Sequence, residues 1–291
     1  MVGMTRKKTI FWLSIFLLPN LLGFLIFIAL PILGSLATSF TDWDLISTIH
    51  FTGFDNYTRL FQDSEFWQSF RNTLTFIIGY LPIVMVIGLA CAILLNQKIK
   101  MRGFFRAVYF LPVITSWVAV SLVWKWLYNP AYGLINYFLS VFGIDGPNWL
   151  TDPHTAMLAV IITSAWKDIG FIMVLFLGGL QNISPSYYEA ASMDGASKWH
   201  QLYAITIPLL APTTFFVTII SLINSFQVFD QVMIMTEGGP SGATTTLVQN
   251  IYNHAFRYFE MGYASAMSWI LFIVIFIITV IQNKLQKRWS N

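Results

Sequence analysis

Long apolar runs separated by short polar segments dominate this chain of 291 residues. A helix needs about 20 apolar residues to cross the hydrocarbon core of a bilayer. Six runs reach this length, at residues 10–36, 73–95, 107–127, 156–180, 209–235 and 263–281. A helix satisfies its own backbone hydrogen bonds in lipid, so the pattern predicts an all-α membrane protein. We expect six transmembrane helices in one bundle that forms a single domain over residues 1–291.

The first apolar run follows Arg6, Lys7 and Lys8, as the apolar region of a signal peptide would. It is too long for that region, however, and no A-x-A cleavage site is evident. We therefore interpret it as a retained span.

Lysine and arginine gather on one side of the six predicted spans. Eleven lie on the side of the two termini: Arg6, Lys7, Lys8, Lys98, Lys100, Arg102, Arg106, Lys198, Lys284, Lys287 and Arg288. Only Arg59, Arg71 and Arg257 lie on the other side. An excess of basic residues marks the cytoplasmic side of a membrane protein. The distribution predicts that both termini are cytoplasmic, as an even number of spans requires.

Composition and motifs exclude several classes of function. Charged residues make up 10% of the chain, against about 25% in a typical soluble domain. The single Cys91 excludes an intrachain disulfide and a thiolate metal cluster. The sequence contains no G-x-x-x-x-G-K-[ST], H-E-x-x-H or G-x-S-x-G motif, and its basic residues are scattered. We therefore predict no catalytic, metal or cofactor-binding residue, and no nucleic-acid partner.

One cytoplasmic segment, with the sequence YYEAASMDGASKWH at residues 187–200, is polar and rich in small side chains. Ser184 and Pro185 are typical of a helix N-cap and first position, and Gly195 suits a helix C-terminus. Ser197 is placed to cap a second short helix. The pattern predicts a helix–turn–helix on the inner membrane surface. From these residues alone, it is either a docking surface or an ordinary amphipathic loop.

The same segment resembles the EAA signature of ABC importer permeases, E-A-A-x3-G-x9-I-x-L-P. The matching residues are Glu189, Ala190, Ala191, Gly195, Ile205 and Pro208, with Ile207 in place of the leucine. Three other stretches, GFDNY at 53–57, RAVYFLP at 106–112 and MTEGGP at 235–240, are similar to binding-protein-dependent sugar permeases of the maltose and glycerol-phosphate type. The resemblance covers nearly the whole chain.

The resemblance implies a permease domain that forms half of the translocation pathway of an ATP-driven importer. The expected solutes are sugars or oligosaccharides, and the expected location is a bacterial or archaeal plasma membrane. Its partners are an ABC ATPase dimer, a second homologous permease and an extracellular solute-binding protein. ATP and Mg²⁺ are expected in the ATPase, with no cofactor in this chain. Residues 184–208 would form the coupling segment, with contacts from Glu189, Ala190, Ala191, Asp194, Gly195, Ile205 and Pro208.

Polar residues inside the predicted spans are candidates for the substrate pathway, because such residues are costly in lipid. The candidates are Asp168, Phe171, Ser221, Asn224, Ser225, Gln227 and Asp230. Ser221, Asn224 and Ser225 share one helical face. Phe226 or Phe229 would offer a ring to the apolar face of a sugar. Hydrogen bonds between helices are the equally weighted alternative for this polar stripe.

Lys167 is adjacent to Asp168, so the two side chains point about 100° apart and need not pair. As the one mid-span cation, Lys167 favours a neutral saccharide over an anion as the solute. A self-contained secondary carrier or channel is the alternative function, although it leaves the EAA segment unexplained. A membrane-embedded enzyme is less favoured, because no catalytic constellation is present in the sequence.

Overall fold

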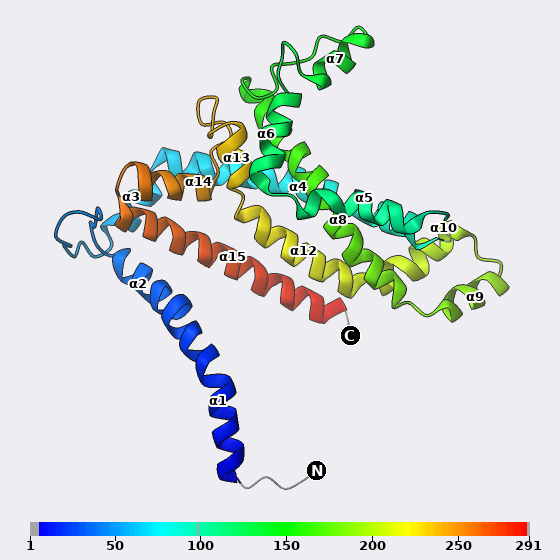
Figure 1. The fold of residues 1–291 in the computed structure, drawn as a ribbon, viewed down its shortest axis with the longest axis horizontal. Helices are drawn as coiled ribbons and strands as arrows, with labels where there is room; N and C mark the ends of the chain where they lie inside the picture. Colours follow the sequence, from blue (N-terminus) through cyan, green and yellow to red (C-terminus); the bar gives the residue numbers. More distant parts are fainter. Residues whose placement is uncertain (1–5, 98, 290–291) are drawn as a thin grey trace. The chain divides into compact units, whose positions relative to one another are not determined.

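The computed structural model of the chain describes residues 6–97 and 99–289, which are almost entirely helical (Figure 1). Lys98, one of the basic residues used to predict orientation, lies outside the described residues. The described part has no β-strand, only an isolated antiparallel bridge between Thr41 and Phe51. The predicted all-α class is confirmed.

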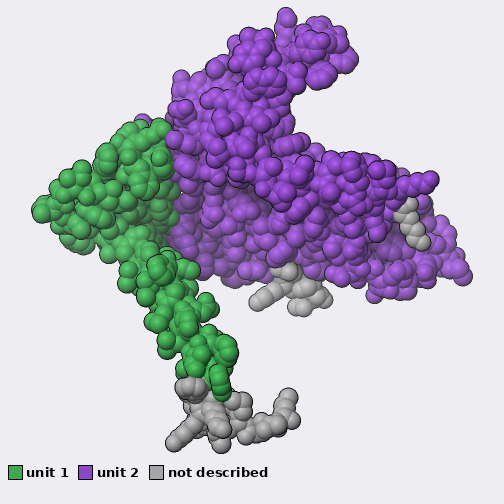
Figure 2. Space-filling model, viewed as in Figure 1, with its two compact units in different colours: residues 1–63, 251–270 green, residues 64–250, 271–291 purple. Residues whose placement is uncertain are grey.

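The helices pack into two compact units (Figure 2). Unit 1 comprises residues 1–63 and 251–270, and unit 2 comprises residues 64–250 and 271–291. The chain therefore crosses between the units three times. The expectation of a single domain over residues 1–291 stays a prediction.

Unit 1 is built on one long N-terminal helix and the start of the last helix. Its elements are α1 (Arg6–Phe24), the π-helical segment η1 (Leu25–Ala29), α2 (Leu30–Thr38), α3 (Asp55–Gln62), the π-helical segment η3 (Asn253–Arg257) and the first part of α15 (Met261–Trp289). Polar side chains join α2 to α15: the Thr38 and Ser265 hydroxyls are 3.0 Å apart, and the Trp269 indole donates to the Ser35 hydroxyl at 3.2 Å.

Unit 2 contains the remaining helices and the larger core. They are α4 (Ser64–Asn96), α5 (Arg102–Ile114), α6 (Trp117–Leu127), α7 (Leu134–Val141), α8 (Pro153–Gln181), α9 (Pro185–Met193), α10 (Lys198–Gln201), the π-helical segment η2 (Leu202–Thr206), α11 (Ile207–Leu209), α12 (Ala211–Phe226), α13 (Asp230–Met235), most of α14 (Leu247–Tyr252) and the rest of α15. Helices α4 and α8 form its centre, and α12 packs against both. Tyr80, Val84, Ile172, Met173 and Val217 are buried there.

Small residues allow the central helices to approach closely. A β-carbon on Gly88 of α4 would lie 2.6 Å from the Ile172 side chain of α8. A β-carbon on Gly170 of α8 would overlap the backbone carbonyl of Tyr109 in α5. Close approach at small residues is the usual way in which membrane helices gain packing contacts, because burial from water does not drive their association.

Four helices of the described part are long and apolar enough to cross a membrane: Trp12–Thr38, Ser64–Asn96, Pro153–Gln181 and Met261–Leu285. Two bent pairs raise the number to six if each pair is one span. One pair joins Lys198–Leu209 to Ala211–Phe226 at 63°, and the other joins α5 to α6 at 98°. The number of predicted spans, six, is therefore reached only if each bent pair is counted as one span.

The predicted span at residues 107–127 is not one straight helix, because it breaks at Thr115 and Ser116. Both residues have extended backbone, and the Ser116 hydroxyl accepts a hydrogen bond from the Ala119 N–H at 3.2 Å. This side-chain cap starts α6 afresh after the end of α5 at Ile114. The break places Trp117 at the first position of α6.

Candidate functional site

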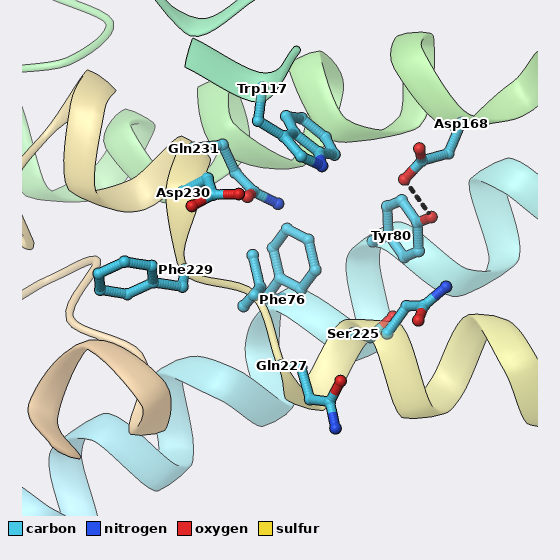
Figure 3. A pocket seen from close by; sticks show the side chains of 11 residues that line it. Phe76, Tyr80, Trp117, Asp168, Ser225, Gln227, Phe229, Asp230 and Gln231 are labelled. Atoms are coloured by element: carbon cyan, nitrogen blue, oxygen red, sulfur yellow. Dashed lines mark hydrogen bonds between the residues drawn. The ribbon is translucent and has the colours of Figure 1, made fainter. Parts of the chain in front are cut away.

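A cavity of about 300 Å³ opens in unit 2 among α4, α6, α8, α12 and α13 (Figure 3). This volume is at the lower end of the range for small-molecule sites. Its wall combines aromatic rings with amide, hydroxyl and carboxyl groups, and we call it the polar cavity. The lining residues are Phe76, Tyr80, Trp117, Asp168, Asn224, Ser225, Gln227, Val228, Phe229, Asp230 and Gln231.

The structure brings most of the predicted pathway residues to this cavity. Those that line it are Asp168, Asn224, Ser225, Gln227 and Asp230. Phe171 instead packs against the hydrophobic core of unit 2. Ser221 is 2% exposed, and its hydroxyl has no hydrogen-bond partner within the described part. Their roles in solute passage stay predictions.

Three aromatic rings of the cavity were not anticipated from the sequence: Phe76, Tyr80 and Trp117. Phe76 and Tyr80 lie four residues apart on one face of α4, and their rings stack with centroids 5.2 Å apart. That spacing was the only available signal, and it is equally typical of a buried helix face. Of the two rings proposed for a sugar, Phe229 lines the cavity, whereas Phe226 is 1% exposed in the core.

Asp168 and Lys167 have different partners, as their 100° separation predicts. The Tyr80 hydroxyl donates to Asp168 Oδ2 at 2.7 Å, across the gap from α4 to α8 (Figure 3). The Lys167 ammonium donates to the Val113 carbonyl at 3.2 Å and lies 4.6 Å from the centroid of the Trp117 ring. Val113 is in the last turn of α5, where carbonyl groups lack helical partners. Lys167 therefore stabilises both sides of the break between α5 and α6.

A second break, at residues 227–229, shapes the wall of the polar cavity. Helix α12 ends at Phe226, and α13 begins at Asp230. The N–H of Gln227, which caps α12, donates to the Asn224 carbonyl at 3.1 Å. The Thr246 hydroxyl satisfies the freed Val228 carbonyl at 2.8 Å. The predicted span at residues 209–235 is therefore not continuous. Irregular backbone is tolerated at membrane depth where it lines a cavity and its polar groups are satisfied.

The segment around the EAA signature forms the predicted helix–turn–helix. Helix α9 begins after Ser184, whose hydroxyl accepts from the Ser186 N–H, and α10 begins after Ser197, whose hydroxyl accepts from the His200 N–H. Gly195 between them has φ +77°, the left-handed conformation that glycine adopts at low cost. The Ala196 N–H donates to the Ala191 carbonyl at 2.9 Å and closes the C-terminus of α9.

The side chains of this segment are mainly free for a partner. Glu189, Ala190, Asp194 and Gly195 are exposed, and Ala191 is half-buried. The Gln201 amide donates to the Ser192 hydroxyl at 2.9 Å and to the Ala196 carbonyl at 3.2 Å, which ties α10 to the end of α9. The segment is thus a preformed surface of low relief.

The last two signature residues lie between the helix–turn–helix and α12. Ile205 is half-buried in η2, and Pro208 follows in α11. The Thr206 hydroxyl lies 3.0 Å from the Tyr188 hydroxyl of α9. This contact joins the helix–turn–helix to the start of the α12 span. The contact thus links α9 to the segment that leads into α12, the helix that lines the polar cavity.

Unit 1 carries a separate cluster of charged groups. Both guanidinium nitrogens of Arg59 donate to Glu260, at 3.0 and 2.9 Å, and His254 Nδ1 lies 2.7 Å from Glu260 Oε2. The Tyr263 hydroxyl donates to Asp63 Oδ2 at 2.6 Å, and the Arg59 guanidinium lies 4.2 Å from the Tyr263 ring centroid. The cluster joins α3 to η3 and the start of α15.

We expect Glu260 to make this cluster sensitive to acid. Partial burial would raise the pKa of Glu260, but the hydrogen bonds from Arg59 and His254 outweigh it and hold the pKa below its ordinary value of 4.5. A carboxyl group whose pKa is lowered in the folded state stabilises the protein at pH values above its unfolded-state pKa. This stabilisation is lost as the pH falls through the lower pKa of the folded state. Thermal unfolding of the purified protein should therefore show a lower midpoint in acid, with a shallower decline in Glu260→Gln.

The matched control is Glu237→Gln, at an exposed carboxyl group of unit 2. It should follow the pH dependence of the wild type. Superimposable curves for Glu260→Gln and the wild type would contradict the assignment.

Across the described residues, no group of three histidine, cysteine, aspartate or glutamate side chains is placed to hold a metal ion. The polar cavity is therefore distinguished by aromatic and hydrogen-bonding groups.

Comparisons with known proteins cover nearly the whole chain. Residues 84–291 match the family described as "Binding-protein-dependent transport system inner membrane component". The probable ABC transporter permease protein YesP of Bacillus subtilis is 36% identical over 281 residues, covering 95% of this chain and 90% of the relative. The trehalose/maltose transport system permease protein MalF of Thermococcus litoralis is 35% identical over 269 residues, covering 92% of this chain and 91% of the relative.

A solved structure has the same fold. A chain of a bacterial ABC transporter involved in the import of the acidic polysaccharide alginate matches with a TM-score of 0.86 and 26% identity. The match covers 98% of each chain.

Proposed function

Because this chain belongs to the family of binding-protein-dependent transport system inner membrane components, we propose that it forms half of a sugar translocation pathway and that the polar cavity is where solute contacts it. The chain is a permease subunit of an ABC importer in the plasma membrane. It works with a separate ATPase, a second permease and a binding protein. It is a transport subunit and not an enzyme.

The composition of the polar cavity wall is the observation that carries this proposal. The rings of Phe76, Trp117 and Phe229 offer flat apolar surfaces, while Asn224 and Gln227 offer amide donors and acceptors. Sugars present both apolar ring faces and hydroxyl groups, so they need both kinds of contact. The wall is more polar than that of a typical small-molecule site, which suits a solute that carries many hydroxyl groups. The trehalose/maltose relative supports a saccharide as the solute class.

We further propose that the helix–turn–helix couples the pathway to the ATPase. Its contact residues would be Glu189, Ala190, Ala191, Asp194, Gly195, Ile205 and Pro208. The exposed low relief of α9 and the contact of Tyr188 with Thr206 support this assignment. ATP and Mg²⁺ would then bind in the ATPase, and the work of hydrolysis would reach α12 through this segment.

The orientation is part of the same proposal. The excess of lysine and arginine on the side of the termini supports cytoplasmic N- and C-termini. That orientation places the helix–turn–helix on the side where ATP is available.

Asn224→Leu is expected to reduce saccharide uptake by about tenfold or more while the complex still assembles. The substitution keeps the side-chain size but removes the amide, and a polar site deprived of one hydrogen bond to a buried partner loses about 1–3 kcal/mol. Uptake of labelled saccharide by cells or vesicles, and the yield of ATPase that co-purifies with the tagged chain, measure the two quantities separately.

The control is Phe216→Leu, at an exposed position of the same helix that does not line the cavity. It should leave both uptake and assembly close to wild-type values. Equal losses of uptake and assembly in Asn224→Leu would instead assign Asn224 to helix packing.

A further inference from the structure

We propose that the polar cavity selects against anionic saccharides and accepts neutral and amino sugars, and that Asp168 and Asp230 impose this preference. The inference rests on the proposed sugar-pathway function and adds the charge class of the solute. It also assigns Asp168 and Asp230 as specificity-determining residues.

The ionisable groups that line the polar cavity are acidic. Asp168 and Asp230 contribute carboxyl groups, and none of the described lining residues is lysine, arginine or histidine. In the view of Figure 3, the two side chains lie on either side of Trp117 and Phe76. A ring-bound solute would therefore have a carboxyl group toward each end.

Asp168 keeps hydrogen-bonding capacity for a solute. Its Oδ2 atom accepts from Tyr80, and the described part shows no hydrogen bond to its Oδ1 atom. A carboxylate has about four acceptor positions, so several remain. Asp230 lies at the exposed start of α13, where its side chain is also accessible. Both groups can accept hydrogen bonds from sugar hydroxyls or from the ammonium of an amino sugar.

Lys167 is adjacent to Asp168 in the sequence and attracts its carboxyl group electrostatically, but the described part shows no ion pair between the two side chains. Its side chain is 5% exposed, and its ammonium is held by the Val113 carbonyl and the Trp117 ring. Releasing it would leave that carbonyl without its donor at the break between α5 and α6. Lys167 is thus committed to the fold and is absent from the cavity lining.

The physical consequence is repulsion of a second negative charge. Charges interact more strongly in a partly buried cavity than in water, and like charges brought together oppose binding strongly. A uronate carboxylate would meet two carboxyl groups without a lining cation. An ammonium at the same position would be attracted, while a neutral sugar would gain hydrogen bonds alone.

The test is direct binding of three size-matched hexose disaccharides to the complex purified with its native partners, without the binding protein. The probes are maltose, a glucosamine disaccharide and a digalacturonate, titrated calorimetrically. We expect the digalacturonate to bind at least about tenfold more weakly than maltose, and the glucosamine disaccharide to bind at least as tightly. In Asp168→Asn and Asp230→Asn, the affinities for the three disaccharides should become similar. The control is Asp55→Asn, at an exposed carboxyl group that does not line the cavity. It should keep the wild-type order of affinities.

Each outcome has a definite meaning. Binding of all three sugars by the wild type with equal affinity, or preference for the digalacturonate, would overturn the charge selectivity and leave the sugar pathway standing. Binding of none of them would overturn the pathway function and this inference with it. An unchanged order in both asparagine variants would remove Asp168 and Asp230 as its cause.

Discussion

Replacing Gly195 by proline is expected to abolish saccharide uptake while the protein still inserts into the membrane. Gly195 has φ +77°, and its N–H donates to the Ser192 carbonyl at 3.1 Å. Proline requires φ near −65° and has no N–H, so it can satisfy neither condition, at a cost of about 3 kcal/mol or more. The end of α9 and the start of α10 would then separate, and the ATPase would lose its preformed docking surface.

The position allows a graded control, because a β-carbon at Gly195 would meet no atom within 4 Å. Any effect must therefore come from the backbone and not from steric overlap. Asparagine tolerates the left-handed conformation and keeps the N–H, so Gly195→Asn should retain most uptake. The measurements are uptake of labelled saccharide and the amount of ATPase recovered with the tagged chain. Recovery of ATPase with the proline variant at the wild-type level would contradict the coupling role.

The second large effect is expected at Gly170, in the contact between α5 and α8. Gly170 is buried, and a β-carbon there would overlap the Tyr109 carbonyl of α5. Gly170→Val must push the two helices apart, and overpacking of this kind costs about 3 kcal/mol, or more where backbone blocks the side chain. Because Lys167 on the same helix holds the end of α5, this displacement would also disturb the neighbouring break.

Gly178→Val on the same helix is the matched control. A β-carbon at Gly178 would have no atom within 4 Å, so both variants share the change in helix propensity but only one creates overlap. The thermal midpoint of the detergent-purified protein should fall markedly for Gly170→Val and little for Gly178→Val. Equal midpoints for the two variants would show that α5 and α8 do not pack tightly at this glycine.

Several features of the fold and site follow from local sequence. The apolar runs predict the helical regions, because a helix in lipid must be long, apolar and internally hydrogen-bonded. Ser184, Gly195 and Ser197 predict the caps and the turn of the helix–turn–helix, since each acts on backbone groups within a few residues. The structure confirms these local elements.

The breaks inside two spans were not predicted, although part of the signal was present. Ser116 is a residue type that favours the N-cap of a new helix, but it lies within an apolar run that hydropathy treats as continuous. At residues 227–229 the freed Val228 carbonyl is satisfied by Thr246, a residue 18 positions away. A break supported by so distant a partner cannot be recognised from its own neighbourhood in the sequence.

The sequence by itself determined the all-helical class, the distribution of basic residues and the local form of the helix–turn–helix, because each depends on the order of nearby residues. The tertiary structure alone decided that Tyr80 bonds Asp168, that Lys167 turns to Val113 and Trp117, and that Phe171 and Ser221 lie away from the polar cavity. These outcomes depend on which helices meet and how far each is rotated. Polar and aromatic residues of a span are equally suited to line a cavity or to join helices, and only packing separates the two.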